Sequence, residues 1–199
     1  MWQPEVLADR REPPDGATEW RAAAVLMGLR ATVEPDTGLP GCSLVLTRRL
    51  PSLKHHPGQI SLPGGACEPS DGSPEMTACR EAEEEIGLPR DHIEPLFQLP
   101  VYRTVTGFEV TPVIGLLPQA CVYRPDPREV AQVFEVPMSF LMNPRHHQRR
   151  GLRIESGPIE FFAMPYEQHF IWGATAAMLR NLYHFFYATW NQSDHSSIR

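Results

Sequence analysis

Residues 80–88 of the chain read Arg80-Glu81-Ala82-Glu83-Glu84-Glu85-Ile86-Gly87-Leu88. We expect this stretch to form the second half of a helix that runs from about Pro74 to Ile86. Ser73 is a suitable N-cap, proline suits the first helical position, and Gly87 suits the C-terminal cap. The signals at both ends agree, so the stretch predicts one well-delimited helix.

Three carboxylates share one side of this predicted helix. At about 100° per residue, Glu81, Glu84 and Glu85 fall within an arc about 100° wide, whereas Glu83 points away toward solvent. The adjoining arc is apolar and can be buried against a sheet. It consists of Ala78, Ala82 and Ile86. The helix is therefore expected to hold its three acids at the edge of a helix–sheet contact.

Like charges three and four residues apart repel one another on a helix. Arg80 precedes Glu84 by four residues and supplies one positive charge, so three acids face one guanidinium. A hard divalent cation such as Mg²⁺, which takes oxygen ligands, would complete the balance and could assist phosphoryl transfer. The competing interpretation of the string alone is an exposed, glutamate-rich helix face.

The sequence before the helix favours the metal interpretation. Pro63-Gly64-Gly65 ends fifteen residues before Arg80, and glycines there let the backbone approach a metal closely. The pattern from Gly65 through Arg80 to Leu88 resembles the Nudix box, the loop–helix–loop signature of Nudix hydrolases. Asp71 takes the place of the usual glutamate, and the arginine comes one residue later than usual. This insertion precedes the helix, so the carboxylate face keeps its spacing.

A second resemblance narrows the family. Residues 46–65 are similar to the segment LLTxRSxxLRxHxGQVxFPGG of the Nudix coenzyme A pyrophosphatases, with departures at Leu50, Lys54 and Leu62. Residues 106–113 and 166–176 resemble segments of the bacterial, NudL-like branch of that group. The resemblance covers roughly residues 20–190.

The resemblance implies a fold and an activity. The implied fold is an α/β/α sandwich built on a mixed β-sheet with the Nudix loop–helix–loop. The implied activity is hydrolysis of the diphosphate of coenzyme A (CoA) or its thioesters to 3′,5′-ADP and 4′-phosphopantetheine or its acylated form. It also implies Mg²⁺ or Mn²⁺ as cofactor, with a small-molecule substrate, CoA or a related nucleotide, as the partner.

The resemblance further implies roles for individual residues. Glu84 and Glu85 are the expected principal metal ligands, and Gly64 is a candidate carbonyl ligand. Glu81 is either a further ligand or the general base, and Arg80 is expected to orient the carboxylates. The remaining candidates lie on other segments. They are Glu129, with Glu135 next, as a further acid, and Arg49, Lys54 and His56 as contacts to substrate phosphates.

Composition sets the broader class. The chain has 199 residues, of which 42% are hydrophobic, which predicts one globular domain over residues 20–190, with an N-terminal extension (1–19) and a polar C-terminal tail (191–199). The net charge of −6 argues against a general nucleic-acid binder. No secretory signal or membrane-spanning run is visible, and the four cysteines form no pair motif, so a cytoplasmic protein is expected.

The remaining pattern predicts strands with few helices. We expect strands over 20–29 and 43–47 that pair across a loop rich in proline and glycine, and further strands over 96–102, 108–117 and 133–136. We also expect a helical turn over 138–142, a hairpin over 152–163 around Gly157-Pro158, and a C-terminal helix over 173–190. Residues 143–151 are expected to form a basic loop, either solvated or in contact with a phosphate.

Two other functions compete with CoA hydrolysis. One is a Nudix hydrolase that prefers ADP-ribose, a dinucleotide or a nucleoside triphosphate, because loops outside the box select the substrate. The other is a nucleotide sensor that binds without turnover, against which the intact acids of the box count. Dimerisation, which is common in the family, is an expectation here.

Overall fold

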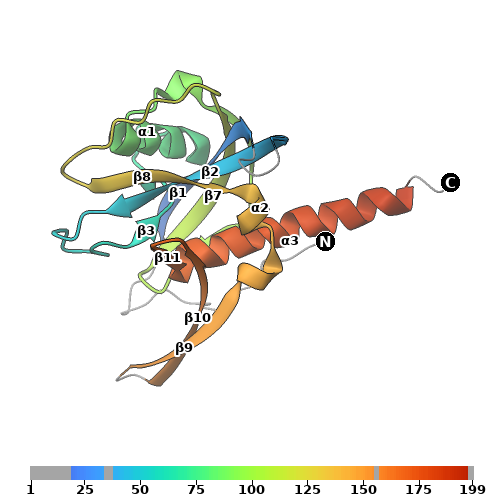
Figure 1. The fold of residues 1–199 in the computed structure, drawn as a ribbon. Coiled ribbons are helices and arrows are strands. Elements are labelled where there is room, and N and C mark those ends of the chain that lie inside the picture. Colours follow the sequence, from blue (N-terminus) through green and yellow to red (C-terminus); the bar gives the residue numbers. More distant parts are fainter. Residues whose placement is uncertain (1–18, 34–37, 155–156, 197–199) are drawn as a thin grey trace.

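The computed structural model describes residues 19–33, 38–154 and 157–196 and shows a large mixed sheet between helices (Figure 1). The expected N-terminal extension lies almost wholly outside the described residues. The elements of the main sheet and its covering helix are β1 (Arg21–Val33), β2 (Pro40–Arg49), β3 (Ile60–Ser61), β4 (Gly64–Ala66), α1 (Pro74–Ile86), β5 (Glu94–Gln98), β6 (Tyr102–Arg103), β7 (Phe108–Leu117) and β8 (Val130–Pro137). The further elements are the short helices η1 (Arg90–His92), α2 (Met138–Leu141) and η2 (Pro144–His146), the strands β9 (Gln148–Ile154), β10 (Gly157–Tyr166) and β11 (His169–Trp172), and the long helix α3 (Gly173–Ser196).

The main sheet contains eight strands in mixed orientation. Its central path runs β3-β2-β1-β7-β5, with β4 on β1, β6 on β7 and β8 on β2. Strands β1 and β2 pair antiparallel with Leu29 opposite Leu44, as the sequence predicts. Strands β1 and β7 pair parallel, with Leu26 opposite Val113. The expected mixed sheet is confirmed.

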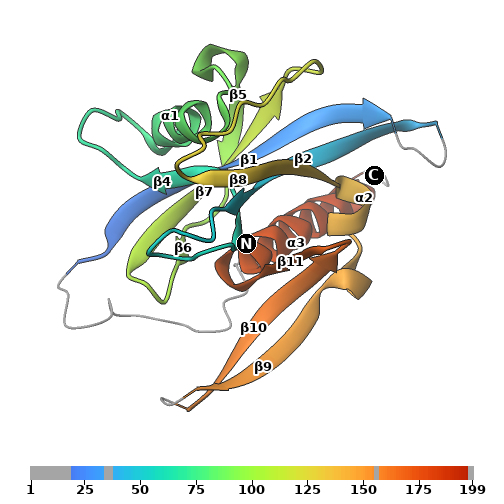
Figure 2. The ribbon, with the colours of Figure 1, turned by 60° about the vertical axis from the view of Figure 1, so that its left-hand side comes forward.

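Alternation along the central strands gives the sheet two buried faces. On β1, Ala24 and Leu26 pack into the core beneath α1, whereas Met27 and Leu29 pack into the core beneath α3. A strand with successive side chains on opposite faces can serve both cores at once. Helices α1 and α3 consequently lie on opposite sides of the sheet (Figure 2), which is the expected α/β/α sandwich.

The ends of α1 follow the predicted capping chemistry. The Ser73 side chain accepts a hydrogen bond from the Met76 backbone N–H, and Pro74 occupies the first turn. Gly87 closes the helix in the left-handed conformation (φ 65°), and a Cβ there would approach the Arg124 Cβ to 2.7 Å. Both the conformation and the close neighbour call for glycine.

The region after β8 differs from the prediction. Residues 143–151 are not a loop: they form η2 and the start of β9. The predicted hairpin over 152–163 is confirmed, with Leu152 opposite Ile159, but Gly157-Pro158 is not its turn, because Gly157 already pairs with Ile154. Backbone pairing of β9, β10 and β11 in a second, three-stranded sheet explains both errors, since neither pairing leaves a strong local signal. In Figures 1 and 2 the β9–β10 hairpin projects away from the main sheet.

The C-terminal helix is longer than predicted. Helix α3 continues six residues past the expected end at Trp190, to Ser196, so the polar tail is helical over most of its length. Its first part packs against the main sheet through Ala176, Leu179 and Leu182. Over the described part of the chain, no helix is both long and apolar enough to span a membrane.

Candidate metal and phosphate site

An acidic pocket of about 210 Å³ lies where α1 meets the loop before β8. Two segments that are about forty residues apart in the sequence build it. Its lining comprises Glu81, Glu84, Glu85, Asp126, Arg128 and Glu129. The three carboxylates predicted to share one helix face therefore open on one cavity, and Glu129 joins them.

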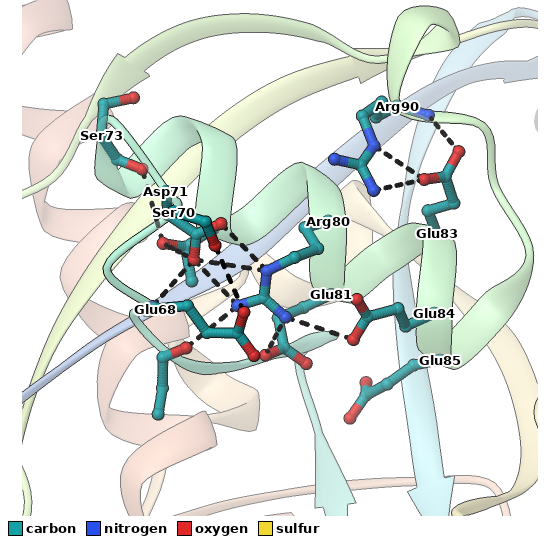
Figure 3. A network of polar contacts seen from close by, with 12 residues as sticks. Glu68, Ser70, Asp71, Ser73, Arg80, Glu81, Glu83, Glu84, Glu85 and Arg90 are labelled. Carbon is teal, nitrogen blue, oxygen red and sulfur yellow. Dashed lines mark hydrogen bonds and ion pairs between the residues drawn. The ribbon is translucent and has the colours of Figure 1, made fainter.

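Arg80 is the hub of the polar network beneath this pocket (Figure 3). Its Nη1 donates to Glu81 at 2.9 Å and to Glu84 at 3.2 Å. Its Nε and Nη2 donate to Asp71 at 3.0 and 2.9 Å, and Nη2 also reaches the Ala66 carbonyl oxygen at 3.1 Å. The side chain is only 9% exposed. Its planar fork is thus fixed on one edge by Asp71 and presents the other edge to the acids of α1.

The sequence alone predicts no role for Asp71, and the structure makes it the anchor of this hub. Besides Arg80, it accepts hydrogen bonds from the Thr77 hydroxyl at 2.9 Å and the Glu68 backbone N–H at 3.0 Å. The Arg80 guanidinium holds the pKa of Asp71 well below its usual value. The one signal in the sequence was a carboxylate six residues after Gly65, the position of the usual glutamate.

Glu85 is the most perturbed acid of the pocket. Burial raises its pKa to about 8, although the nearby Arg49 guanidinium opposes the rise. Arg49 Nη1 lies 3.6 Å from Glu85 Oε1. Neither Glu85 Oε2 nor Arg49 Nε has a hydrogen-bond partner, although both atoms are buried. Burial also raises the pKa of Glu81, against the effect of Arg80.

Two glycines let the acids lie close to the backbone of β4. A Cβ on Gly65 would stand 2.5 Å from Glu81 Oε1, so any side chain there would displace this carboxylate. Gly64 has a φ of 156° and pairs with Val25 of β1; a Cβ on it would lie 2.6 Å from the Val25 Cα. The backbone N–H of Gly64 also favours the ionised form of Glu85. Both glycines are therefore required by contacts.

The donor set fits a hard divalent cation. Glu85 Oε2 is a buried oxygen ligand without a partner, and Glu84, whose side chain is 56% exposed, lines the same pocket. Within residues 19–33, 38–154 and 157–196, no three carboxylate, histidine or cysteine groups already stand in chelating positions. Arg80 accounts for this, because it holds Glu81 and Glu84 on its own side.

The loop before β8 is fixed by its own contacts. Arg128 pairs with Asp126 at 2.6 Å, and the Leu50 backbone N–H donates to the Glu129 carbonyl oxygen at 2.9 Å. The exposed Glu129 lines the pocket, whereas Glu135 lies elsewhere, bound by Arg30 at 2.7 Å. The further contacts of Glu135 are to the hydroxyls of Ser43 and Tyr123. Glu135 is accordingly a structural acid.

A second cavity, of about 400 Å³, lies beside the C-terminal end of β2. Arg48 lines it, while the adjacent Arg49 faces Glu85, as alternation along a strand requires. Lys54 and His56 are exposed on the intervening loop and line neither of these two cavities. The full lining is Arg48, Pro57, Gly58, Gln59, Ile60, Gln168, His169, Phe170 and Trp172.

The basic side chains of residues 143–151 are engaged in local contacts. His147 Nε2 lies 2.7 Å from the Leu141 carbonyl oxygen, and His146 stacks on Phe140 with ring centres 4.0 Å apart. Arg149 pairs with Glu160. This segment therefore carries structural interactions and stands apart from the acidic pocket.

Comparison with known proteins agrees with the geometry. The model of the NUDIX domain family matches residues 31–153. The Nudix hydrolase NudL of Photorhabdus laumondii, named as uncharacterized, is 38% identical over 164 residues, which cover 81% of this chain and 83% of NudL. The NudL of Escherichia coli K12, also named as uncharacterized, is 36% identical over 81% of each chain.

The fold comparison points the same way. The crystal structure of the Nudix hydrolase RenU from M. smegmatis superposes with a TM-score of 0.57 and 20% identity, covering 88% of this chain and 92% of RenU. At that identity the match speaks for the fold. With the family model, the relatives and the sandwich in agreement, the chain belongs to the Nudix hydrolase family, with the NudL proteins among its relatives.

Proposed function

We propose that the chain hydrolyses the diphosphate bond of CoA in a reaction that depends on Mg²⁺ or Mn²⁺, releasing 3′,5′-ADP and 4′-phosphopantetheine. One observation carries the metal-dependent part: Glu85, which lines the acidic pocket, has a buried carboxylate oxygen without a hydrogen-bond partner. An uncompensated buried acid is costly, and a divalent cation is the ligand that matches it.

The residues in and around the pocket would have separate roles in binding the metal, orienting the acids and transferring the proton. Glu84 and Glu85 would hold the cation, with the Gly64 carbonyl oxygen as a further candidate ligand. A cation held there supplies positive charge against the charge that develops on the diphosphate and favours ionisation of the attacking water. Arg80, fixed by Asp71, would keep Glu81 and Glu84 oriented. The function of Glu81 or Glu129 would be to accept the proton of the water.

The choice of CoA rests on the segment 46–65 and its surroundings. This segment is similar to that of the coenzyme A pyrophosphatases, and it connects the acidic pocket, where Arg49 faces Glu85, with the second cavity, which Gln59 and Ile60 line. A substrate with a diphosphate and a long second arm would need two such places. Lys54 and His56, on the loop between them, are candidates for contacts to the substrate phosphates.

Product analysis tests this proposal. The protein would be incubated with CoA, acetyl-CoA, ADP-ribose, NADH and a nucleoside triphosphate, in Mg²⁺, Mn²⁺ or EDTA, beside a Glu84→Gln variant. Metal-dependent release of 3′,5′-ADP, fastest among the panel and reduced by orders of magnitude in the variant, is expected. Faster turnover of ADP-ribose or another compound would show that this compound, and not CoA, is the preferred substrate. Binding without any turnover would favour a nucleotide sensor. Dimerisation and cytoplasmic location stay predictions.

A further inference from the structure

Arg49 forms an incomplete ion pair with Glu85, one of the acids that line the acidic pocket. Their closest atoms, Nη1 and Oε1, are 3.6 Å apart, beyond hydrogen-bond distance. By contrast, Arg30 and Glu135 in the same protein are joined by two hydrogen bonds of 2.7 Å. Arginine–carboxylate pairs usually adopt that bidentate geometry. The loose pair is therefore unusual for this protein.

Each residue of this loose pair also has one buried polar atom that lacks a hydrogen-bond partner. These atoms are Arg49 Nε, a donor, and Glu85 Oε2, an acceptor. Leaving charged groups unsatisfied in a buried place is costly, so such a pair is expected where each group has a better partner in another state. A cation is the better partner for a carboxylate, and a phosphate oxygen is the better partner for a guanidinium.

Arg80 and Arg128, the other arginines in contact with acids of this region, have no comparable freedom. Arg80 uses its three guanidinium nitrogens on Asp71, the Ala66 carbonyl oxygen and the acids of α1. Arg128 is held in its own loop by Asp126. Arg49 is 24% exposed, whereas Glu85 is 5% exposed, so the arginine is the partner that can move.

We propose that Arg49 is an internal counter-ion of the metal site. In the metal-free protein Arg49 pairs with Glu85, and when a cation binds Glu85, Arg49 moves to a phosphate oxygen of the substrate. The inference rests on the proposed function only in that a divalent cation and a phosphate group enter this pocket. The cation and Arg49 then compete for binding to Glu85, and a bound phosphate group removes this competition because it pairs with Arg49. By linkage, phosphate and cation each tighten the binding of the other.

Mn²⁺ binding tests this inference without any turnover. Free Mn²⁺ would be measured by electron paramagnetic resonance for the wild type, Arg49→Gln, Arg49→Lys and Arg48→Gln, with thermal melting as the check on folding. Each titration would be repeated with α,β-methylene-ADP, correcting for the Mn²⁺ that this analogue binds in solution. Arg48→Gln is the matched control, because it removes the same charge from the next residue, which lines the other cavity.

Without the analogue, Arg49→Gln is expected to bind Mn²⁺ about tenfold more tightly than the wild type, whereas Arg48→Gln stays within about twofold. The analogue should tighten Mn²⁺ binding to the wild type by a similar factor and have little effect on Arg49→Gln. Arg49→Lys keeps the competing charge without the planar fork, so it should bind Mn²⁺ like the wild type and show weaker coupling.

Equal effects of Arg49→Gln and Arg48→Gln would overturn the inference, because the gain would then be general electrostatics. Weaker Mn²⁺ binding by Arg49→Gln would also overturn it, since Arg49 would then assist the metal. The proposed function fails separately. If the protein shows the expected pattern of Mn²⁺ binding but does not hydrolyse CoA, the counter-ion role of Arg49 stands and CoA is not the substrate. A folded wild type that binds no Mn²⁺ would remove both.

Discussion

Gly65→Ala should separate activity from stability. The added Cβ would stand 2.5 Å from Glu81 Oε1, and ordinary contact begins at 3.4 Å, so the carboxylate must move by about 0.9 Å. The carboxylate is the far end of a flexible side chain, and the backbone at Gly65 does not have positive φ, so the fold should tolerate the change. The displacement pulls Glu81 from its 2.9 Å hydrogen bond with Arg80.

A misplacement of about 1 Å in catalytic geometry can cost on the order of 100-fold in rate. We therefore expect kcat/KM for the best substrate of the panel to fall about 100-fold in Gly65→Ala, with a thermal midpoint within a few degrees of the wild type. Gly151→Ala is the matched control, because its Cβ would meet its nearest neighbour at 3.8 Å. Activity of Gly65→Ala within twofold of the wild type would refute the role assigned to Glu81.

Three further predictions concern stability and the hub. Burial lowers the pKa of His147, so the folded protein favours its neutral form, and the free energy of unfolding should be full above pH 6.5, the ordinary pKa, and decline as the pH falls below it. Chemical unfolding at several pH values should show a smaller decline for His147→Gln. Part of the decline should remain, because burial also lowers the pKa of His169. Glu135→Gln should lower the free energy of unfolding by about 2 kcal/mol, because its ion pair with Arg30 is partly buried, and should leave Mn²⁺ affinity unchanged by calorimetry. Asp71→Asn should release one edge of Arg80 and lower kcat more than it raises KM; a change in KM alone would contradict the positioning role of Asp71.

The helix and its acids could be predicted from the sequence because their signals are local. Ser73, Pro74 and Gly87 act within one turn of the helix ends, and the spacing of the glutamates fixes which of them share a face. The pairing of β1 with β2 was likewise visible as two apolar runs across a loop rich in proline and glycine. Local chemistry thus accounts for α1, for the β1–β2 pair and for one wall of the pocket, whereas the α/β/α sandwich was implied by the family resemblance.

The rest depended on contacts between distant segments. Asp126 and Arg128 line the pocket only because the chain returns to α1 forty residues later, and no short motif marks that return. The ion pair of Asp71 with Arg80 required the loop to fold back over nine residues. The arginine-rich start of β9 predicts a basic loop, whereas backbone pairing with β10, which has no local signal in the sequence, makes it a strand.

The most direct test of the central claim compares two neighbouring glutamates of α1. Glu85→Gln removes the buried, unpartnered carboxylate, whereas Glu83→Gln removes an exposed one that pairs with Arg90 outside the pocket. With CoA and Mg²⁺, we predict that Glu85→Gln loses turnover by orders of magnitude, that Glu83→Gln retains it, and that EDTA abolishes it in every variant. Full turnover by Glu85→Gln, or turnover that survives EDTA, would contradict a metal-dependent reaction in this pocket.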